Sequence, residues 1–134
     1  MLLAYIFFII KEILKIPSKP VKKDQRGYII PIGGGEDKFA SPTVLEKFVQ
    51  LSGGGEAKIA IIPTASKLPD TGGIYVDIFT KMGVKEVHNL KIETRLDATI
   101  NKEYQDILFH CTGIFMTGGN QLLLSTTLGG TAYS

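Results

Sequence analysis

The stretch AKIAIIP, residues 57–63, is almost wholly apolar and contains three isoleucines. This composition is typical of a short β-strand that is buried on both faces, as in a parallel sheet. The segments on both sides of it are predicted to be helices. Residues 41–55 place apolar side chains at helical spacing and end in glycines that suit a helix C-terminus, and residues 72–83 form a second helical stretch that Gly83 closes.

The alternation of strand and helix continues in both directions from this stretch. We expect strands over residues 27–32, 84–92 and 112–117, and helices over residues 97–111 and 118–130. Ser41 is the expected N-cap of the first helix, with Pro42 at its first position, and Asp97 or Thr99 lies near the cap of the third helix. Strands alternating with helices imply parallel pairing and right-handed crossovers. The sequence therefore predicts an α/β fold: an open, mostly parallel sheet with helices on both faces.

Composition narrows the classes of function. The chain has 134 residues, which is enough for one domain. Its net charge of +2 does not indicate the strongly basic surface that nucleic-acid binding requires. Cys111 is the single cysteine, so the chain has no internal disulfide and no cysteine-based zinc site, and we identify no metal-ligand cluster. A reducing, cytoplasmic location is consistent with this cysteine usage. We expect no cofactor and no nucleic-acid partner.

The first 26 residues differ from the rest of the chain. An apolar run, residues 1–10, precedes a basic stretch with two prolines, so we divide the chain into an extension, 1–26, and an α/β domain, 27–134. A ten-residue helix is about 15 Å long, half the hydrocarbon thickness of a bilayer. Three interpretations stay open: a helix or extension that packs on the domain or a partner, an anchor to the membrane surface through residues 1–16, or a cleaved secretion signal.

Each expected strand is followed by a loop with polar or glycine residues. Residues 33–37 read GGGED, residues 63–66 read PTAS, residues 93–97 read ETRLD, and residues 117–121 read TGGNQ. In parallel strands these loops share the carboxyl edge of the sheet, which is where open α/β sheets bind ligands. We therefore place the functional site at this edge.

The loop with Gly118, Gly119 and Asn120 joins a buried strand to a helix start. Backbone N–H groups exposed there, together with the helix dipole, suit stabilisation of an oxyanion. The alternative is an ordinary N-cap by Asn120. The loop GGGEDK is neither a dinucleotide fingerprint nor a phosphate loop, so a nucleotide-binding function has little support. Two interpretations of Gly33, Gly34 and Gly35 stay open: they allow a tight turn of the backbone, or they allow its N–H groups to approach a substrate closely.

The two histidines give no catalytic arrangement. His88 falls inside an expected strand, and we interpret it as structural. His110 is followed directly by Cys111, but consecutive side chains on a helix point about 100° apart and do not form a dyad. Cys111 is expected to be a small buried residue.

Together the four loops carry a resemblance. IPIGGGEDK, IIPTAS, ETRLDA and FMTGGNQLLLSTTLGGTA resemble the amino-terminal half of the cyanophycinases, which belong with dipeptidase E among serine peptidases. The resemblance runs from about residue 27 to residue 132. It implies a class I glutamine-amidotransferase-like fold, a flavodoxin-like arrangement of three layers. It also implies hydrolysis of cyanophycin, multi-L-arginyl-poly-L-aspartate, to β-aspartyl-arginine dipeptides by a Ser-His-Glu triad that needs no metal.

The resemblance also assigns residues to the site. Gly118 and Gly119 match the turn that helps to build the oxyanion hole, and Gln121 matches a glutamine near the substrate cleft. The remaining matched positions are Asn120 in the same turn, Gly33, Gly34 and Gly35 along the same edge, and Arg95 and Asp97 in an R-x-D-A element that contacts substrate or fixes the loop. Leu123 departs from the family, which often has a basic residue there.

The nucleophile elbow of the family, Gly-Thr-Ser-Ala-Gly, does not occur in this chain. Ser134 in GGTAYS imitates it but follows a helix tail instead of an apolar strand, so we do not expect it to be the nucleophile. The expected protein is a truncated family member that is inactive alone, with a peptide or cyanophycin-like substrate. The alternative is a non-catalytic α/β module whose open sheet edge pairs with a partner or a second copy.

Overall fold

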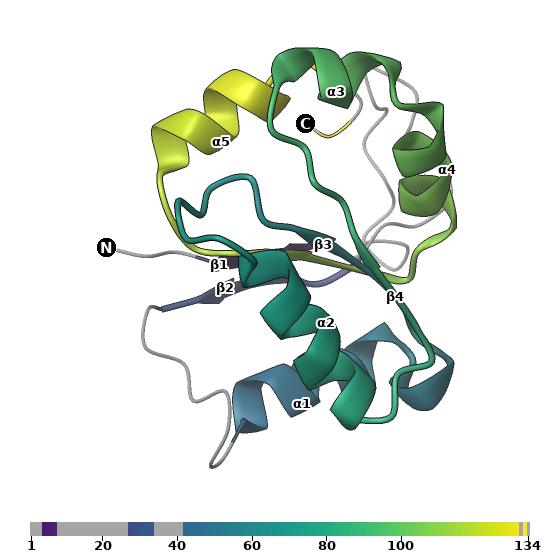
Figure 1. The fold of residues 1–134 in the computed structure, drawn as a ribbon. Coiled ribbons are helices and arrows are strands. Elements are labelled where there is room, and N and C mark those ends of the chain that lie inside the picture. Colours follow the sequence, from purple (N-terminus) through teal and green to yellow (C-terminus); the bar gives the residue numbers. More distant parts are fainter. Residues whose placement is uncertain (1–3, 8–26, 34–41, 132, 134) are drawn as a thin grey trace.

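The computed structural model describes residues 4–7, 27–33, 42–131 and 133. The described elements are, in chain order, β1 (Ala4–Phe7), β2 (Ile29–Ile32), α1 (Thr43–Ser52), the short 3-10 helix η2 (Gly54–Glu56), β3 (Lys58–Ile62), α2 (Thr71–Lys81), β4 (Glu86–Asn89), α3 (Arg95–Ile100), α4 (Lys102–His110), β5 (Gly113–Met116) and α5 (Gln121–Leu128). Figure 1 shows three layers, with α1 and α2 on one face of the sheet and α3, α4 and α5 on the other. The predicted α/β class is confirmed.

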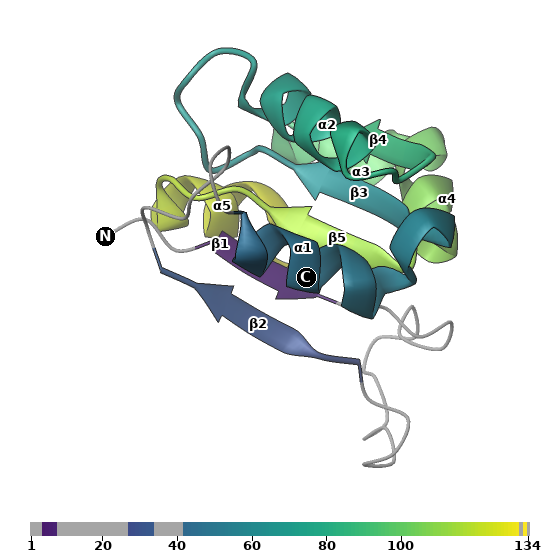
Figure 2. The same cartoon turned by 90° about the horizontal axis from the view of Figure 1, so that it is seen from below.

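The sheet has five strands in the order β2-β1-β5-β3-β4. β3 pairs in parallel with β4 on one side and with β5 on the other, so the parallel core of the prediction is confirmed. β1 is antiparallel to both of its neighbours, β2 and β5, as the opposed arrows of Figure 2 show. β2 therefore runs in the same direction as β3, β4 and β5 although it pairs with none of them.

β1 lies within the apolar run at residues 1–10, for which the sequence leaves three interpretations open, none of them a strand of the sheet. Ala4–Phe7 form a strand between β2 and β5, with Tyr5 opposite Pro31 on one side and Met116 on the other. A strand in this place gives both neighbours partners for backbone groups that would otherwise stay unpaired. The other residues of 1–26 lie outside the described part of the chain, so the division at residue 26 stays a prediction.

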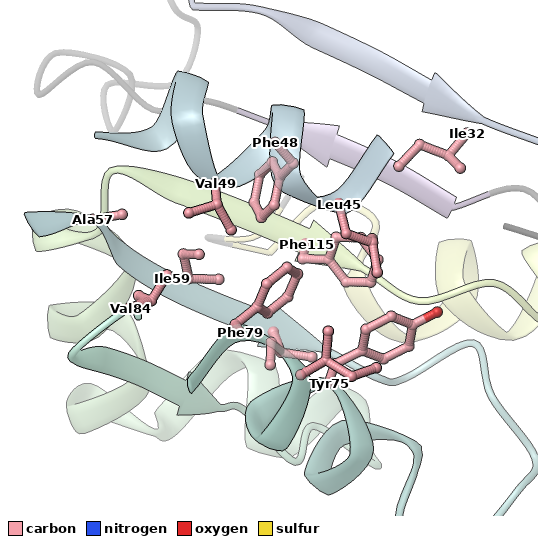
Figure 3. Close-up of a cluster of buried hydrophobic side chains, with 12 residues drawn as sticks. Ile32, Leu45, Phe48, Val49, Ala57, Ile59, Tyr75, Phe79, Val84 and Phe115 are labelled. Atoms are coloured by element: carbon pink, nitrogen blue, oxygen red, sulfur yellow. The ribbon is translucent and has the colours of Figure 1, made fainter. Parts of the chain in front are cut away.

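The face covered by α1 and α2 holds an aromatic cluster. The ring centroid of Phe115 on β5 lies 5.6 Å from the ring centroid of Phe48, 5.3 Å from that of Phe79 and 4.5 Å from that of Tyr75. Figure 3 shows these rings between the helices and the sheet. Burial of four rings in edge-on and tilted contacts contributes a large part of the apolar stabilisation of this face.

The opposite face is mainly aliphatic, with Tyr133 as the aromatic residue among its described buried members. Most of its buried residues come from β3, β5, the three helices above them and the segment after β4, among them Ile62, Leu90, Ala98, Leu108 and Leu128. Residues alternate between the faces along β5, since Ile114 and Met116 join this cluster and Phe115 joins the aromatic one. This alternation follows from the twofold repeat of a strand.

One end of α1 differs from the prediction and the other agrees with it. Pro42 occupies the N-cap of α1 instead of the first helical position, and Ser41 lies outside the described residues. Gly53 ends α1 with φ of 117°, so the expected glycine C-cap is confirmed.

The helix expected over residues 97–111 is two helices. Asn101 ends α3, and its side chain accepts a hydrogen bond from the Tyr104 N–H at the start of α4. α3 also begins earlier than expected, at a capping box formed by Thr94 and Asp97. Asn favours caps over helix interiors, which explains the break.

Candidate functional site

The loops that follow β3, β4 and β5 are tied together by hydrogen bonds at the carboxyl edge of the sheet. The Asn120 N–H donates to the Ala65 carbonyl at 2.8 Å, which joins the loop after β5 to the loop after β3. The Thr64 hydroxyl donates to the Ile92 carbonyl at 2.8 Å, which joins the loop after β3 to the segment after β4. These three predicted loops therefore meet. Gly33 ends the described part after β2, and Gly34 and Gly35 lie outside it.

The turn after β5 depends on a close backbone approach. Gly119 has φ of 155°, and a Cβ at this position would overlap the Ala65 carbonyl group. Only glycine accepts both conditions without strain. Among the described residues, the amides of Gly118 and Gly119 have no hydrogen-bond acceptor. Two backbone donors are thus available beside the N-terminus of α5, which is the arrangement that suits an anion.

Asn120 is the N-cap of α5. Its Oδ1 accepts hydrogen bonds from the N–H groups of Leu122 at 2.9 Å and Leu123 at 3.1 Å. The ordinary capping role that we considered for this side chain is therefore present. It satisfies two of the first N–H groups of the helix and fixes the direction in which the preceding turn points. Gln121, the first residue of α5, is exposed.

Asp97 stabilises the start of α3. Its Oδ2 accepts hydrogen bonds from the Thr94 N–H at 2.8 Å and the Glu93 N–H at 3.3 Å. The hydroxyl and then the N–H of Thr94 hold the pKa of Asp97 below its usual value, because both stabilise the carboxylate. The carboxylate thus fixes the loop after β4, and contact with a substrate stays a prediction.

Arg95 reaches from α3 to the C-terminus of α5. Its Nη1 donates to the carbonyls of Gly129 at 2.6 Å and Thr126 at 3.3 Å. A guanidinium in this position pairs with the carbonyl end of the helix dipole. Arg95 therefore joins the segment after β4 to the exit from α5, and a direct contact with substrate is not needed to account for its position.

Arg95→Ala is expected to lower the free energy of unfolding by about 1 kcal/mol, since a charged donor at a helix C-terminus contributes an amount of this order. Arg95→Lys keeps the charge but loses the planar fork, so its loss should be smaller. Urea denaturation of both variants and the parent chain measures the difference. Equal stability of Arg95→Ala and the parent would show that the contacts to Thr126 and Gly129 contribute nothing.

A cavity of about 430 Å³ opens beside this edge. It is lined by the loop after β3, the first residues of α2, the end of β4 and one residue of α5: Pro63, Thr64, Ser66, Leu68, Pro69, Asp70, Thr71, Gly72, Asn89, Lys91, Ile92, Glu93 and Leu123. Of the nine residues predicted for the site, the seven that the structure describes do not line it, although Leu123 is close to them in the sequence. The sequence analysis did not identify Asp70 and Asn89 as residues of this cavity. The sequence DTGG at residues 70–73, at the start of a helix, is the feature that could have pointed to it.

The histidines and the cysteine lie away from this edge. His88 Nε2 is 3.3 Å from a carboxylate oxygen of Glu86 within the same edge strand. Cys111 is buried, as expected, and its thiol donates to the Leu108 carbonyl at 3.1 Å. Burial raises the pKa of the Cys111 thiol to about 12, so the thiol is protonated at neutral pH and is a poor nucleophile.

The described residues hold neither a metal-ligand cluster nor a membrane-spanning helix. In this part of the chain, no three histidine, cysteine or acidic side chains lie close enough to hold a metal ion. None of its helices combines the length and the apolar character that crossing a membrane requires.

Comparison with known proteins points to one family. Residues 29–133 match the model of peptidase family S51. A cyanophycinase of Geminocystis herdmanii is 42% identical over 112 residues, which is 83% of this chain and 41% of the relative. A cyanophycinase of Synechococcus elongatus is 46% identical over 104 residues, 77% of this chain and 32% of the relative, and one of Trichormus variabilis is 38% identical. The chain thus spans less than half the length of these relatives.

Proposed function

Because the chain belongs to peptidase family S51, we propose that it forms the oxyanion half of a serine-type hydrolase that acts on cyanophycin. The observation that carries this proposal is the turn at Gly118 and Gly119. Its two amides have no acceptor among the described residues, and they lie beside the N-terminus of α5 at the carboxyl edge of the sheet. The relatives that share this segment are cyanophycinases.

In the proposed reaction, a serine hydroxyl attacks the carbonyl of the scissile peptide bond and passes its proton to a base. The carbonyl oxygen becomes an oxyanion, which accepts hydrogen bonds from the amides of Gly118 and Gly119. Collapse of this intermediate breaks the C–N bond, the base returns the proton to the leaving amine, and water then releases the acyl group. The product is a β-aspartyl-arginine dipeptide.

The nucleophile and base of this proposal come from sequence outside these 134 residues. No segment of the chain combines an apolar strand with a Gly-x-Ser-x-Gly elbow. The chain supplies positioning groups instead: the oxyanion turn, the Asn120 cap that orients it, and the Arg95 contact that holds the exit of α5. We therefore expect the 134-residue chain alone to be inactive.

The test is a chimera in which residues 29–133 replace the matching segment of the Geminocystis herdmanii cyanophycinase. The chimera should release β-aspartyl-arginine from cyanophycin, and the 134-residue chain alone should release none above buffer. Release by the chain alone would contradict an external nucleophile. A chimera that folds, as shown by a cooperative thermal transition, but releases no dipeptide would contradict the peptidase assignment.

A second candidate function is supported by the outer strand of the sheet. β2 lies at one edge, and Ile29 on it is 68% exposed. An apolar edge strand is a template for pairing with another chain, so this edge suits a non-catalytic module that binds a partner or a second copy. Sedimentation equilibrium separates the possibilities: a chain that stays monomeric over a 100-fold range of concentration, roughly from 1 to 100 μM, would contradict self-pairing of moderate affinity.

A further inference from the structure

β1 fills a place between two strands that run in the same direction. It pairs antiparallel with β2 on one side and with β5 on the other, as Figure 2 shows. β2, β3, β4 and β5 all lie within residues 29–133, which match the family model, whereas β1 lies outside that match. The strand that separates two strands of the matched segment therefore comes from a part of the chain that the family model does not include.

β1 begins at the carboxyl edge of the sheet and runs away from it. Ala4 lies opposite Ile32, the last residue of β2, and Tyr5 lies opposite Met116, the last residue of β5. A strand in this direction pairs with the backbone of both neighbours, but its C-terminal end lies at the other edge. β1 thus closes the gap in the sheet and brings no strand-to-helix turn to the edge that holds the oxyanion turn.

The oxyanion turn restricts where a nucleophile can be held, and this step rests on the proposed function. An elbow serine sits at the end of a strand, here called the elbow strand, in the turn that leads into a helix. Its hydroxyl has to reach a carbonyl whose oxygen lies about 2.7–3.1 Å from the amides of Gly118 and Gly119. Neighbouring strands are about 4.8 Å apart, so a strand two places from β5 is about 10 Å away. The elbow strand must therefore lie directly beside β5 and run parallel to it.

β5 has two neighbours in the described sheet, β3 and β1. β3 pairs in parallel with the whole of β5, from Gly113 to Met116. The loop after β3 also provides the Ala65 carbonyl that accepts the hydrogen bond of Asn120. The oxyanion turn thus depends on β3, and this side of β5 is not available to another strand. The place that remains is the one that β1 holds.

We propose that β1 is a replaceable strand: it holds the place beside β5 that the elbow strand takes, so the two exclude each other. The segment that displaces β1 is extended and apolar, ends in a Gly-x-Ser-x-Gly turn, and inserts parallel to β2 and β5. Backbone hydrogen bonds to both neighbours recognise it, as in other insertions of a strand into a sheet. A chain with β1 in place is closed to this segment, so the apparent affinity is reduced in proportion to the fraction of chains in which the place is open.

The experiment measures binding of a labelled synthetic peptide to the 134-residue chain by fluorescence anisotropy. The peptide has an alternating run of valine and isoleucine followed by Gly-Thr-Ser-Ala-Gly, with a lysine at each end for solubility. The control peptide has a proline in the middle of the apolar run, which removes a ladder hydrogen bond and prevents insertion. We expect the first peptide to bind and the control peptide to bind at least about tenfold more weakly. Equal binding of both peptides would overturn the proposal.

A variant of β1 tests whether this strand competes with the peptide. Ile6→Pro removes a ladder hydrogen bond from β1, whichever neighbour that bond joins, and should raise the affinity for the peptide about tenfold. Ile6→Val is the matched control, because it keeps the preference for a strand, and it should leave the affinity within about twofold of the parent. Equal affinity of Ile6→Pro and the parent chain would overturn the proposal.

A disulfide between β1 and β5 tests the same exclusion without weakening β1. Tyr5 and Met116 are paired in the register, and directly opposite residues of an antiparallel pair have Cβ atoms about 4.5–5.5 Å apart, close to the range that a disulfide spans. The chain with Tyr5→Cys and Met116→Cys, together with Cys111→Ser to prevent mispairing, should bind the peptide only after reduction. Equal binding before and after reduction would place the peptide elsewhere, such as the outer edge of β2, and overturn the proposal. Failure of the disulfide to form would also overturn it, because β1 would not lie beside β5.

The binding experiment and the chimera fail separately. Peptide binding is measured without any reaction, so an inactive chimera would contradict the peptidase proposal while a difference between the oxidised and reduced chains still supported the replaceable strand. An active chimera together with peptide binding that ignores both Ile6→Pro and the disulfide would leave the peptidase proposal intact and overturn this inference.

Discussion

Phe115→Ala is expected to lower the free energy of unfolding by about 3–5 kcal/mol, which is the usual range for truncating a buried phenylalanine. Phe115 is fully buried on the central strand β5, and its ring contacts three aromatic rings from α1 and α2. Removal of the ring leaves a cavity between both helices and the sheet, which rigid neighbouring rings fill poorly. Denaturation with guanidinium, followed by circular dichroism, measures the change.

Val44→Ala on α1 is the matched control for Phe115→Ala. Val44 is 45% exposed and lies on the same helix as Phe48, so its truncation should change stability by about 0.5 kcal/mol or less. If both variants lost similar amounts of stability, the aromatic cluster would not be the centre of this layer.

Gly119→Ala is expected to destabilise the chain by about 3 kcal/mol or more, through backbone strain together with a steric overlap. The Cβ would overlap the Ala65 carbonyl, which also accepts the hydrogen bond from Asn120. The turn after β5 and the loop after β3 would have to separate, and the positions of the two free amides would change with them. Thermal unfolding measures the loss of stability, and amide shifts of Gly118 report the change in the turn.

Gly55→Ala, in the short 3-10 helix η2, controls for the general cost of replacing a glycine outside the α-helices and strands. A Cβ at Gly55 meets only the Gly83 carbonyl at 3.5 Å, an ordinary contact, and Gly55 has no left-handed φ. We expect a change within about 0.5 kcal/mol. A stable, native-like Gly119→Ala chain would contradict the close approach of the two loops and remove the geometric basis of the oxyanion turn.

The central part of the fold could be predicted because its signals are local. β3 is a continuous apolar run and α1 has apolar side chains at helical spacing, so both appear in the structure close to the expected ranges. The break at Asn101 was missed because the apolar spacing continues through it, while the cap that divides the helices is a single side chain. β1 was missed because a short apolar run does not distinguish a strand from a buried helix.

The meeting of three loops at one edge of the sheet could be predicted, but the contacts of their side chains could not. Topology brings the loops after β3, β4 and β5 to one edge, and hydrogen bonds between these loops confirm this. The roles of individual side chains depend on distant partners. Arg95 contacts carbonyls more than 30 residues away, and Asn89 meets Gly72 across the gap between β4 and α2. Such pairings are consequences of packing, and no spacing in the sequence indicates them.

The place of β1 in the sheet has a consequence for synthesis of the chain. β1 is translated more than 100 residues before its partner β5. At roughly 5–20 residues per second, translation leaves β1 without that partner for about 5–20 s. Of the two strands that pair with β1 in the described sheet, β2 alone is present during this time, and an isolated two-stranded pair is marginally stable in water. The nascent chain therefore carries an apolar strand that chaperones can bind until β5 emerges, and closure of the sheet is a late, long-range step.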